Sequence, residues 1–481
     1  MNRRSLPQLF AVAVVVAGCM DDPVRPDRPS APQFSQVTEG RYIVELSGNA
    51  SNFSKAVAAL GGTVETLHTG AGIATVSGVT DAAALALASV SGVSAVHPDV
   101  EIQLAPQMEE WQGVEDLSAE PASPTNPTTA VRYSFQWNMR RIEANVAWAA
   151  GKLGDAGVTV AILDSGIDTE NLDMAGRVDL SRSASFVPSD DAFMTKWLPT
   201  RPKIEDLNGH GTNVATQVSS NAIYLAGVNS RTRLLAIKVL GRTGGGTLSG
   251  ILNGLIYAAD QGADVANMSL GVPRGVNKAG SGSFVGLSNR VFNYAYRQGM
   301  VIVVSAGNDT INMSGAGRIY TAYCESPHVI CVSATGPTAS VNPFFGPWQN
   351  EDALAPYSNF GEKITVAAPG GTSRGYVASV CARRRVTGFA VVPPDTIPTL
   401  PVFGCLTATP NSAVIVGYAG TSQAAPHVAG LAAKLVEVYG KNNPAAVRDA
   451  LLTLGVDDLG AAGFDDIYGY GRINVRKALG L

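Results

Sequence analysis

The sequence predicts an α/β fold, a doubly wound and mostly parallel sheet flanked by helices, with a smaller α+β domain in front of it. From about residue 158 onward, short apolar runs rich in Val, Ile and Ala alternate with longer segments of helical periodicity. Such alternation is typical of a parallel sheet that carries helices on both faces. With 481 residues, 46% of them apolar and 15% charged, the chain can bury a large core and is expected to form more than one domain.

The charge balance argues against nucleic acid as a partner. The formal net charge is -4 and the isoelectric point is near 5.8. A basic surface is the usual electrostatic sign of a nucleic-acid-binding protein, and this chain has no basic excess. The whole sequence holds only 5 histidines, which narrows the choice of a general base.

The first residues have the pattern of an export signal. Residues 1–19 begin with Arg3 and Arg4, continue through an apolar run too short to span a bilayer, and end in Val-Ala-Gly-Cys19. This ending resembles a bacterial lipobox, in which Cys19 would be the lipidated first residue after cleavage. An ordinary secretory signal with an incidental cysteine is the alternative. Residues 20–39 are expected to be a flexible tether, and any lipid on Cys19 would be the contact with the membrane.

Residues 40–104 are expected to fold as a small domain of their own. The hydrophobic pattern predicts a β-α-β-β-α-β order, which is that of a ferredoxin-like sandwich. The expected elements are a strand at 41–46, a helix at 52–60, strands at 64–68 and 73–76, a helix at 80–90 and a strand at 93–96. Residues 105–132 are rich in Pro, Glu, Ser and Thr and are expected to be an exposed linker.

The larger domain, residues 133–481, places polar residues where its strands end. Expected strands lie at 158–162, 234–240, 265–269, 301–306 and 329–334, and expected helices begin at 210, 248 and 284. Active sites of such sheets lie at the carboxyl ends of the strands. Asp164, Ser269 and Asn308 all follow a strand in this way.

A serine stands at the start of a strongly apolar segment near the C-terminus. In Gly420–Gly430 (GTSQAAPHVAG), Ser422 follows Gly-Thr and precedes a helical run, with Pro426 expected in the first turn of that helix. A serine hydroxyl needs a base to take its proton, and the base needs a group that orients it. Asp164 and His210 lie upstream and can supply these two groups.

Three segments together identify the chain as similar to the subtilisin-like serine peptidases. DSGID at 164–168, GHGT at 209–212 and GTSQAAPHVAG at 420–430 resemble the active-site signatures of that family, in its order along the chain. The resemblance implies a serine endopeptidase with a catalytic triad of Asp164, His210 and Ser422. Asn308 would then stabilise the oxyanion, and residues 40–104 would be an inhibitory propeptide.

The same resemblance implies where substrate and propeptide bind. Gly244, Gly245 and Gly246, and Ser269, Leu270 and Gly271, resemble the two segments that flank an extended peptide substrate. Taken alone, the three glycines also fit a flexible loop. Residues 96–104 resemble a propeptide end that runs into the cleft, and the maturation cut is expected within 105–132. The expected partners are protein or peptide substrates and the chain's own propeptide, with a monomeric enzyme exported to the envelope or beyond it.

Two other functions compete with this interpretation. Gly371-Thr372-Ser373-Arg374-Gly375 has the G-x-S-x-G pattern of an esterase, but no apolar helix follows Ser373. The only histidine after it is His427, which is expected to be a packing residue. An esterase that uses Ser422, and a catalytically idle, lipid-anchored binding protein, are the alternatives to a peptidase.

The remaining cysteines suggest disulfides, and no motif suggests a metal. Cys324, Cys331, Cys381 and Cys405 allow three pairings, of which sequence proximity favours Cys324 with Cys331 and Cys381 with Cys405. Four free buried thiols are the alternative. The spacing does not fit zinc. The segment from His210 to Gly227 is short for the calcium loop of some family members, so a structural calcium is possible but has no support in the sequence. No cofactor is expected to be needed for the chemistry.

Overall fold

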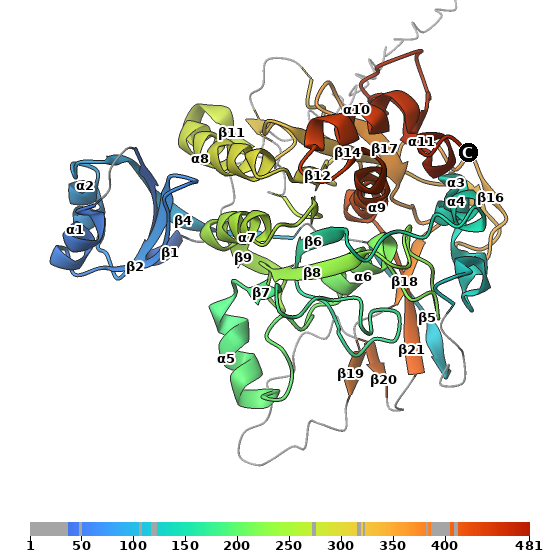
Figure 1. The fold of residues 1–481 in the computed structure, drawn as a ribbon, viewed down its shortest axis with the longest axis horizontal. Coiled ribbons are helices and arrows are strands. Elements are labelled where there is room, and N and C mark those ends of the chain that lie inside the picture. Colours follow the sequence, from blue (N-terminus) through green and yellow to red (C-terminus); the bar gives the residue numbers. More distant parts are fainter. Residues whose placement is uncertain are drawn as a thin grey trace, which may run out of the picture.

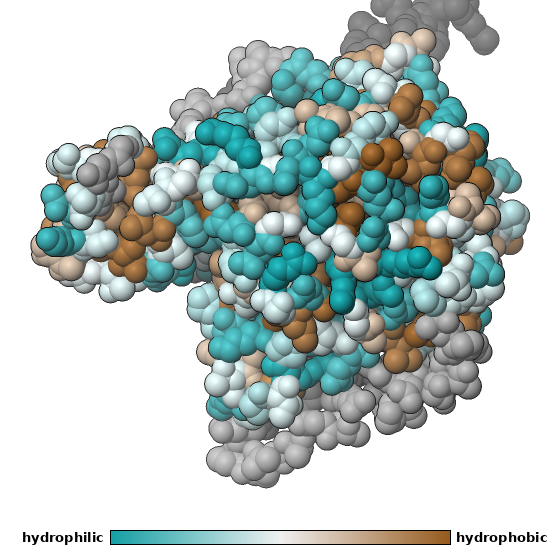
Figure 2. Space-filling view, in the orientation of Figure 1, coloured by the Kyte–Doolittle hydropathy of each residue, from teal (hydrophilic) through white to brown (hydrophobic). Residues whose placement is uncertain are grey.

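The structure, a computed structural model, consists of a small N-terminal lobe and a larger body (Figure 1). It describes residues 37–47, 51–104, 108–116, 123–271, 276–314, 319–320, 323–380, 383–385, 405–407 and 412–481. In the space-filling view the lobe protrudes from the body, and polar and apolar residues are mixed over the visible surface (Figure 2). The predicted signal segment with Cys19, and Cys381, lie outside the described residues. No helix in the described ranges is both long and apolar enough to cross a membrane.

The lobe has the predicted β-α-β-β-α-β order. Its elements are β1 (Val37–Leu46), α1 (Phe53–Ala59), β2 (Thr63–His68), β3 (Ile73–Ser77), α2 (Asp81–Leu87) and β4 (Val93–Gln103). The four strands form an antiparallel sheet in the order β2-β3-β1-β4. β1 begins at Val37, inside the stretch expected to be tether.

Alternation along β1 explains why this strand, in the middle of the lobe's sheet, is buried on both faces. Tyr42, Val44 and Leu46 pack with Phe53 and other residues of the lobe's own helices, whereas Ile43 joins the hydrophobic core of the larger body. Successive side chains of a strand point to opposite faces, so one face packs on α1 and α2 and the other on the body. The lobe is therefore docked through its sheet, as Figure 1 shows.

The body is organised around a nine-stranded sheet in the order β22-β23-β17-β14-β12-β10-β6-β8-β7. Every neighbouring pair is parallel except β22 with β23. The strands are β6 (Thr159–Asp164), β7 (Ala184–Ser185), β8 (Arg233–Lys238), β10 (Val265–Met268), β12 (Val301–Ser305), β14 (Val329–Thr335), β17 (Val366–Pro369), β22 (Val456–Asp457) and β23 (Arg472–Ile473). The central strands are continuous apolar runs because helices cover both of their faces.

The helices divide into two layers, which confirms the predicted doubly wound fold. α6 (His210–Val218), α9 (Thr421–Tyr439) and α10 (Pro444–Leu454) pack on one face, and α7 (Leu248–Asp260) and α8 (Lys278–Arg297) pack on the other. The other helices are α3 (Trp137–Arg141), α4 (Ala144–Ala149), α5 (Pro188–Trp197) and α11 (Val475–Ala478), with 3-10 turns at Pro127–Thr129 and Tyr133–Phe135. The strands of the body outside the main sheet are β5 (Met108–Asp116), β9 (Gly245–Thr247), β11 (Val276–Asn277), β13 (Ile319–Tyr320), β15 (Ala339–Ser340), β16 (Trp348–Gln349), β18 (Val377–Val380), β19 (Arg383–Arg385), β20 (Cys405–Thr407) and β21 (Ser412–Ala419).

The stretch expected to be an exposed linker is largely ordered against the body. β5 forms an antiparallel pair with β21 along its whole length. Further on, the backbone N–H of Val131 donates to Ile223 O at 3.0 Å and that of Arg132 to Tyr224 O at 2.9 Å. Strand pairing uses backbone groups. An acidic sequence without clear periodicity can therefore still form a strand when it lies along the unpaired edge of another strand, here β21.

Candidate active site

Asp164 and His210 form a buried hydrogen-bonded pair at the carboxyl end of the central sheet. Asp164 is the last residue of β6 and His210 the first of α6, and Oδ1 of Asp164 lies 2.7 Å from Nδ1 of His210. Oδ1 also accepts from the Ser165 backbone N–H at 2.7 Å. Because a carboxylate only accepts, the histidine proton is assigned to Nδ1. Nε2 of the neutral ring is then the atom that can take a proton.

A second aspartate, Asp206, fixes the turn that leads into His210. Its Oδ1 accepts from Ser165 Oγ at 2.9 Å and from the Gly209 N–H at 2.8 Å. Its Oδ2 accepts from the N–H and the hydroxyl of Thr212 at 2.8 and 2.6 Å. The carboxylate therefore satisfies free donors at the start of α6 and ties them to the turn after Asp164. Sequence reasoning did not single out Asp206, which lies four residues before the first residue of α6 and outside the usual N-cap position.

The glycines on either side of His210 are required by two different constraints. Gly209 has φ +106°, a left-handed conformation that strains other residues. A Cβ on Gly211 would lie 2.1 Å from the carbonyl oxygen of Gly166. The helix can approach the Asp164 turn this closely only because position 211 has no side chain.

Ser422 is the second residue of α9 and points toward the end of β10. Its Oγ donates to Ser269 O at 3.3 Å, and its side chain is buried, at 5% exposure for the residue. In the other direction, Ser269 Oγ donates to the Ser422 carbonyl oxygen at 2.8 Å. Asn267 Nδ2 donates to Ser269 Oγ at 3.0 Å. The Ser422 backbone is therefore fixed by a short chain of hydrogen bonds from β10.

Pro426 lies deeper in α9 than the sequence suggested. It was expected in the first turn, but α9 begins at Thr421, so Pro426 is inside the helix. Proline has no N–H to donate to the carbonyl four residues earlier, which is that of Ser422. The Ser269 hydroxyl supplies the missing donor to that carbonyl.

Asn308 follows β12 and is held against the residue before the serine. Its Oδ1 accepts from both the N–H and the hydroxyl of Thr421, each at 2.8 Å. This fixes the amide so that the oxygen faces Thr421 and the NH₂ group is the part that can donate elsewhere. An Asn amide held in this way is one of the side chains that can stabilise a developing oxyanion.

Of the two expected substrate-binding segments, the glycine segment pairs with the chain's own residues. β9 receives the end of β4 as an antiparallel strand, with Ile102 opposite Gly246 and Gln103 opposite Gly245. The Leu104 N–H donates to Gly244 O at 2.9 Å.

In the Ser269, Leu270 and Gly271 segment, the Ser269 and Leu270 side chains are buried. The Ser269 side chain contacts Ser422, so its hydroxyl is engaged inside the enzyme.

The lobe is anchored beside this pairing by a carboxylate on the N-terminus of α7. Asp99 is fully buried, and its Oδ1 and Oδ2 accept from the N–H and the hydroxyl of Ser249 at 2.9 and 2.5 Å. Arg41 Nε lies 3.1 Å from Oδ2. A carboxylate at a helix N-terminus is favourable, whereas burial raises the pKa of Asp99.

His427 is a buried structural residue on the helix that carries Ser422. Its Nδ1 lies 2.7 Å from Gln423 O and its Nε2 2.8 Å from Asn138 Nδ2. The ring is thus neutral, with Nδ1 donating and Nε2 accepting. Burial lowers the pKa of His427 to about 4. The competing serine, Ser373, is exposed in a turn that no helix follows.

The structure joins Cys324 and Cys331, whose Cα atoms are 5.1 Å apart, in a disulfide. The other expected partner pair cannot be placed, because Cys381 and the Cys405 side chain lie outside the described residues. Among the described residues, no three His, Cys, Asp or Glu side chains are arranged to hold a metal ion.

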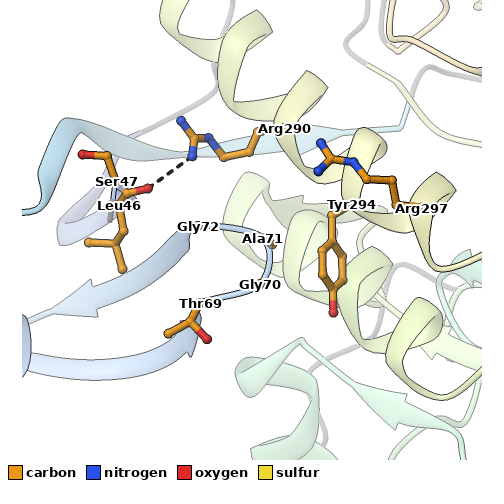
Figure 3. Close-up of a pocket in the computed structure, with 9 residues that line it drawn as sticks. All are labelled: Leu46, Ser47, Thr69, Gly70, Ala71, Gly72, Arg290, Tyr294 and Arg297. Atoms are coloured by element: carbon orange, nitrogen blue, oxygen red, sulfur yellow. Dashed lines mark hydrogen bonds between the residues drawn. The ribbon is translucent and has the colours of Figure 1, made fainter. Parts of the chain in front are cut away.

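A cavity of about 270 Å³ lies between the lobe and α8 (Figure 3). It is lined by Thr69–Gly72 of the lobe and by Arg290, Tyr294 and Arg297 of α8, and Arg290 Nη1 donates to Leu46 O at 3.2 Å. Arg290 also pairs with Glu45 at 3.1 Å. None of the predicted catalytic residues lines this cavity, which belongs to the interface of the lobe.

A doubly wound sheet with an aspartate–histidine pair and a serine at a helix start is the arrangement expected of a serine hydrolase. The chain belongs to the Subtilase family, whose match covers residues 155–471. It is 31% identical over 356 residues to the Thermophilic serine proteinase of Bacillus sp. (strain AK1), covering 73% of this chain and 69% of that one. It is 30% identical over 349 residues to Subtilisin Savinase of Lederbergia lenta, covering 72% and 98%.

The fold is also found in a solved structure. The Epidermin Leader Peptide Processing Serine Protease (EpiP) of Staphylococcus aureus superposes with a TM-score of 0.66 at 21% identity, covering 92% of this chain and 98% of that one. With these relatives, the chain is a serine peptidase of the subtilisin-like type.

Proposed function

We propose that the chain is an endopeptidase in which Asp164, His210 and Ser422 act as a catalytic triad. The 2.7 Å bond from Asp164 to Nδ1 of His210 carries the proposal, since it leaves Nε2 as the base. Nε2 takes the Ser422 hydroxyl proton as Oγ bonds to the carbonyl carbon of the substrate. The proton then passes to the leaving amine as the peptide bond breaks. Water resolves the acyl-enzyme by the same route, and the Asn308 NH₂ group holds the oxyanion in both steps.

Labelling and turnover together test this chemistry. A fluorophosphonate probe is expected to label the wild-type chain and not Ser422→Ala, and a quenched peptide is expected to be cut internally by the wild type alone. Labelling with ester turnover but no peptide turnover would support an esterase. No labelling of correctly folded wild type would support an idle binding protein.

We infer that residues 40–104 inhibit the enzyme as a propeptide. The support is the pairing of residues 101–103 with β9, together with the buried Asp99 on α7. An added strand on the substrate edge blocks an extended peptide from the same edge. The maturation cut is proposed within residues 105–132, which join the lobe to the rest of the chain.

Export and lipidation extend the same proposal to the first residues. We propose that residues 1–19 direct export and that Cys19 is lipidated, with residues 20–39 as a tether. Because Cys19 lies on the lobe's side of the proposed cut, self-cleavage would release the catalytic domain from the membrane. Membrane fractionation tests this: the catalytic domain of the wild type should be soluble and that of Ser422→Ala membrane-bound. Equal partition in both would contradict it.

A further inference from the structure

We infer that the edge of β21 that pairs with β5 is a binding site for the substrate segment after the scissile bond, and that β5 occupies this site as a second inhibitory strand. The inference rests on the proposed peptidase function. The ligand is an extended polypeptide that is recognised through its backbone groups. It has at least five residues beyond the cleavage point and is added to β21 as an antiparallel strand.

The described residues before and after 105–107 each pair with a strand of the body, β9 before them and β21 after them. Residues 101–103 pair with β9 and Leu104 donates to Gly244, which brings the chain to the substrate edge from its N-terminal side. The next described residue, Met108, pairs with Ala419, three positions before Ser422. The peptide links from Leu104 to Met108 can span at most about 14 Å. Leu104 and Met108, on either side of residues 105–107, therefore contact the expected substrate segment and the strand that leads to Ser422.

The pairing between β5 and β21 is long. Met108–Gln112 pair in unbroken register with Ala419–Ile415, and after a register shift the pairing continues to Asp116 opposite Ser412. This ladder runs away from Ser422 and is far longer than the three-residue contact on β9.

β21 has two edges, of which β5 covers one. The three-stranded sheet has the order β18-β21-β5, so β21 pairs on its other side with β18 only. Ile415, Val416, Tyr418 and Ala419 are almost fully buried, and Ile415 and Ala419 belong to a hydrophobic cluster of the body. One row of β21 backbone N–H and C=O groups becomes free when β5 leaves, while β18 still pairs with the other edge. Such an edge is a template for another strand.

A regulatory consequence follows from the position of β5 in the chain. A cut anywhere before Met108 leaves residues 108–116 attached to the catalytic domain, where they compete with substrate for β21. Substrates with a long segment after the scissile bond would be held back by this competition, and substrates with a short one would not. The enzyme then distinguishes substrates by length on that side.

Proline substitution in β5 tests the occupancy of β21. In an antiparallel ladder, alternate residues donate to the partner strand, so Glu110→Pro with Trp111→Pro removes a donor whichever of the two faces β21. Glu110→Ala with Trp111→Ala is the matched control. In the Ser422→Ala background, amide hydrogen exchange of residues 414–419 should be faster with the prolines than with the alanines. A peptide of the sequence MEEWQGVED, added in excess, should restore the protection.

Substrate length tests the function of the edge. Two quenched peptides share one cleavage sequence and differ in carrying two or eight residues after the scissile bond. In the active chain, the ratio of kcat/KM for the long peptide to that for the short one should rise about tenfold or more from the alanine to the proline variant, as the ladder becomes free. N-methylation at successive positions of the long peptide should lower that ratio at alternate positions only.

The outcomes separate this inference from the proposed function. Turnover of the short peptide with a ratio near one in every variant, and no methylation pattern, would show that the edge of β21 does not bind substrate and would overturn the inference. Loss of folding in the proline variant but not in the alanine control would do the same. If neither peptide is cut, the peptidase proposal fails, while the exchange experiment still decides whether β21 accepts a strand.

Discussion

The hydroxyl of Ser269 donates a 2.8 Å hydrogen bond to the carbonyl oxygen of Ser422, the acceptor that Pro426 leaves without a helical partner. Ser269 therefore supplies the hydrogen bond that the α9 backbone lacks at Ser422. Ser269→Ala should leave a buried carbonyl unsatisfied and cost about 1–3 kcal/mol of stability. It should also lower kcat by loosening the Ser422 backbone.

A double substitution tests whether the stability lost by Ser269→Ala comes from the unsatisfied Ser422 carbonyl. Pro426→Ala restores an N–H four residues after Ser422, so Ser269→Ala/Pro426→Ala should recover part of the stability lost by Ser269→Ala alone. Urea unfolding in the Ser422→Ala background, free of self-digestion, gives the comparison. Additive losses in the double variant would show that the two residues do not share this carbonyl.

Asn308 anchors Thr421 through its oxygen, and its nitrogen is the proposed oxyanion donor. Asn308→Ala should lower kcat about 10²–10³-fold, the range measured for an oxyanion donor in subtilisin, a member of the same family. Asn308→Asp keeps the oxygen that accepts from Thr421 but removes the donor. If oxyanion binding dominates, both variants lose activity; an active Asn308→Asp would show that anchoring Thr421 is what matters.

Stability should fall in acid because His427 is buried in its neutral form. Its pKa is about 4 in the folded chain and near 6.5 when unfolded, so between these values the unfolded chain binds a proton that the folded chain does not. The resulting loss of stability is absent above pH 6.5 and grows as the pH falls. It lowers the free energy of unfolding by about 3 kcal/mol at pH 4. His427→Gln should be less stable at pH 7 and lose less stability than the parent on acidification. Unfolding of both in the Ser422→Ala background at several pH values is the measurement; parallel curves would contradict the assignment.

The contact between the lobe and the larger body depends on Asp99, a buried carboxylate at the N-terminus of α7. Asp99→Ala should weaken docking of the lobe by removing two hydrogen bonds to Ser249, with an expected effect of about 2 kcal/mol. The time lag before activity appears in freshly refolded chain should shorten accordingly. Asp99→Asn, which keeps an acceptor of the same size, should give an intermediate lag. A lag unchanged in both variants would mean that the lobe does not control activity through this contact.

The disulfide between Cys324 and Cys331 closes a short loop, so its contribution should be small. A loop of this length predicts about 2 kcal/mol of stability from chain entropy. Cys324→Ala/Cys331→Ala should lower the unfolding free energy by about that amount and leave kcat unchanged, because neither residue contacts the predicted triad among the described residues. A large loss of kcat would show that this loop shapes the site.

Much of the fold could be predicted from the sequence because buried parallel strands are continuous apolar runs. Val160–Ile162 and Val301–Val304 are such runs, and the helices between them have clear periodicity. β5 was missed because its pairing depends on the backbone of β21 and not on its own acidic sequence. The fold places Asp164 and His210 together as the motifs implied, but the supporting contacts of Asp206 and Ser269 depend on residues far apart in the chain. Sequence patterns register local periodicity, whereas such contacts exist only once the fold has formed.

The central claim is that this is a serine peptidase that processes its own chain, and intact mass tests it most directly. Purified wild type is expected to appear as two fragments from one cut within residues 105–132, and Ser422→Ala as the whole chain. The fragment masses would also identify the bond. Both chains remaining whole, or both being cut at the same bond, would contradict the claim.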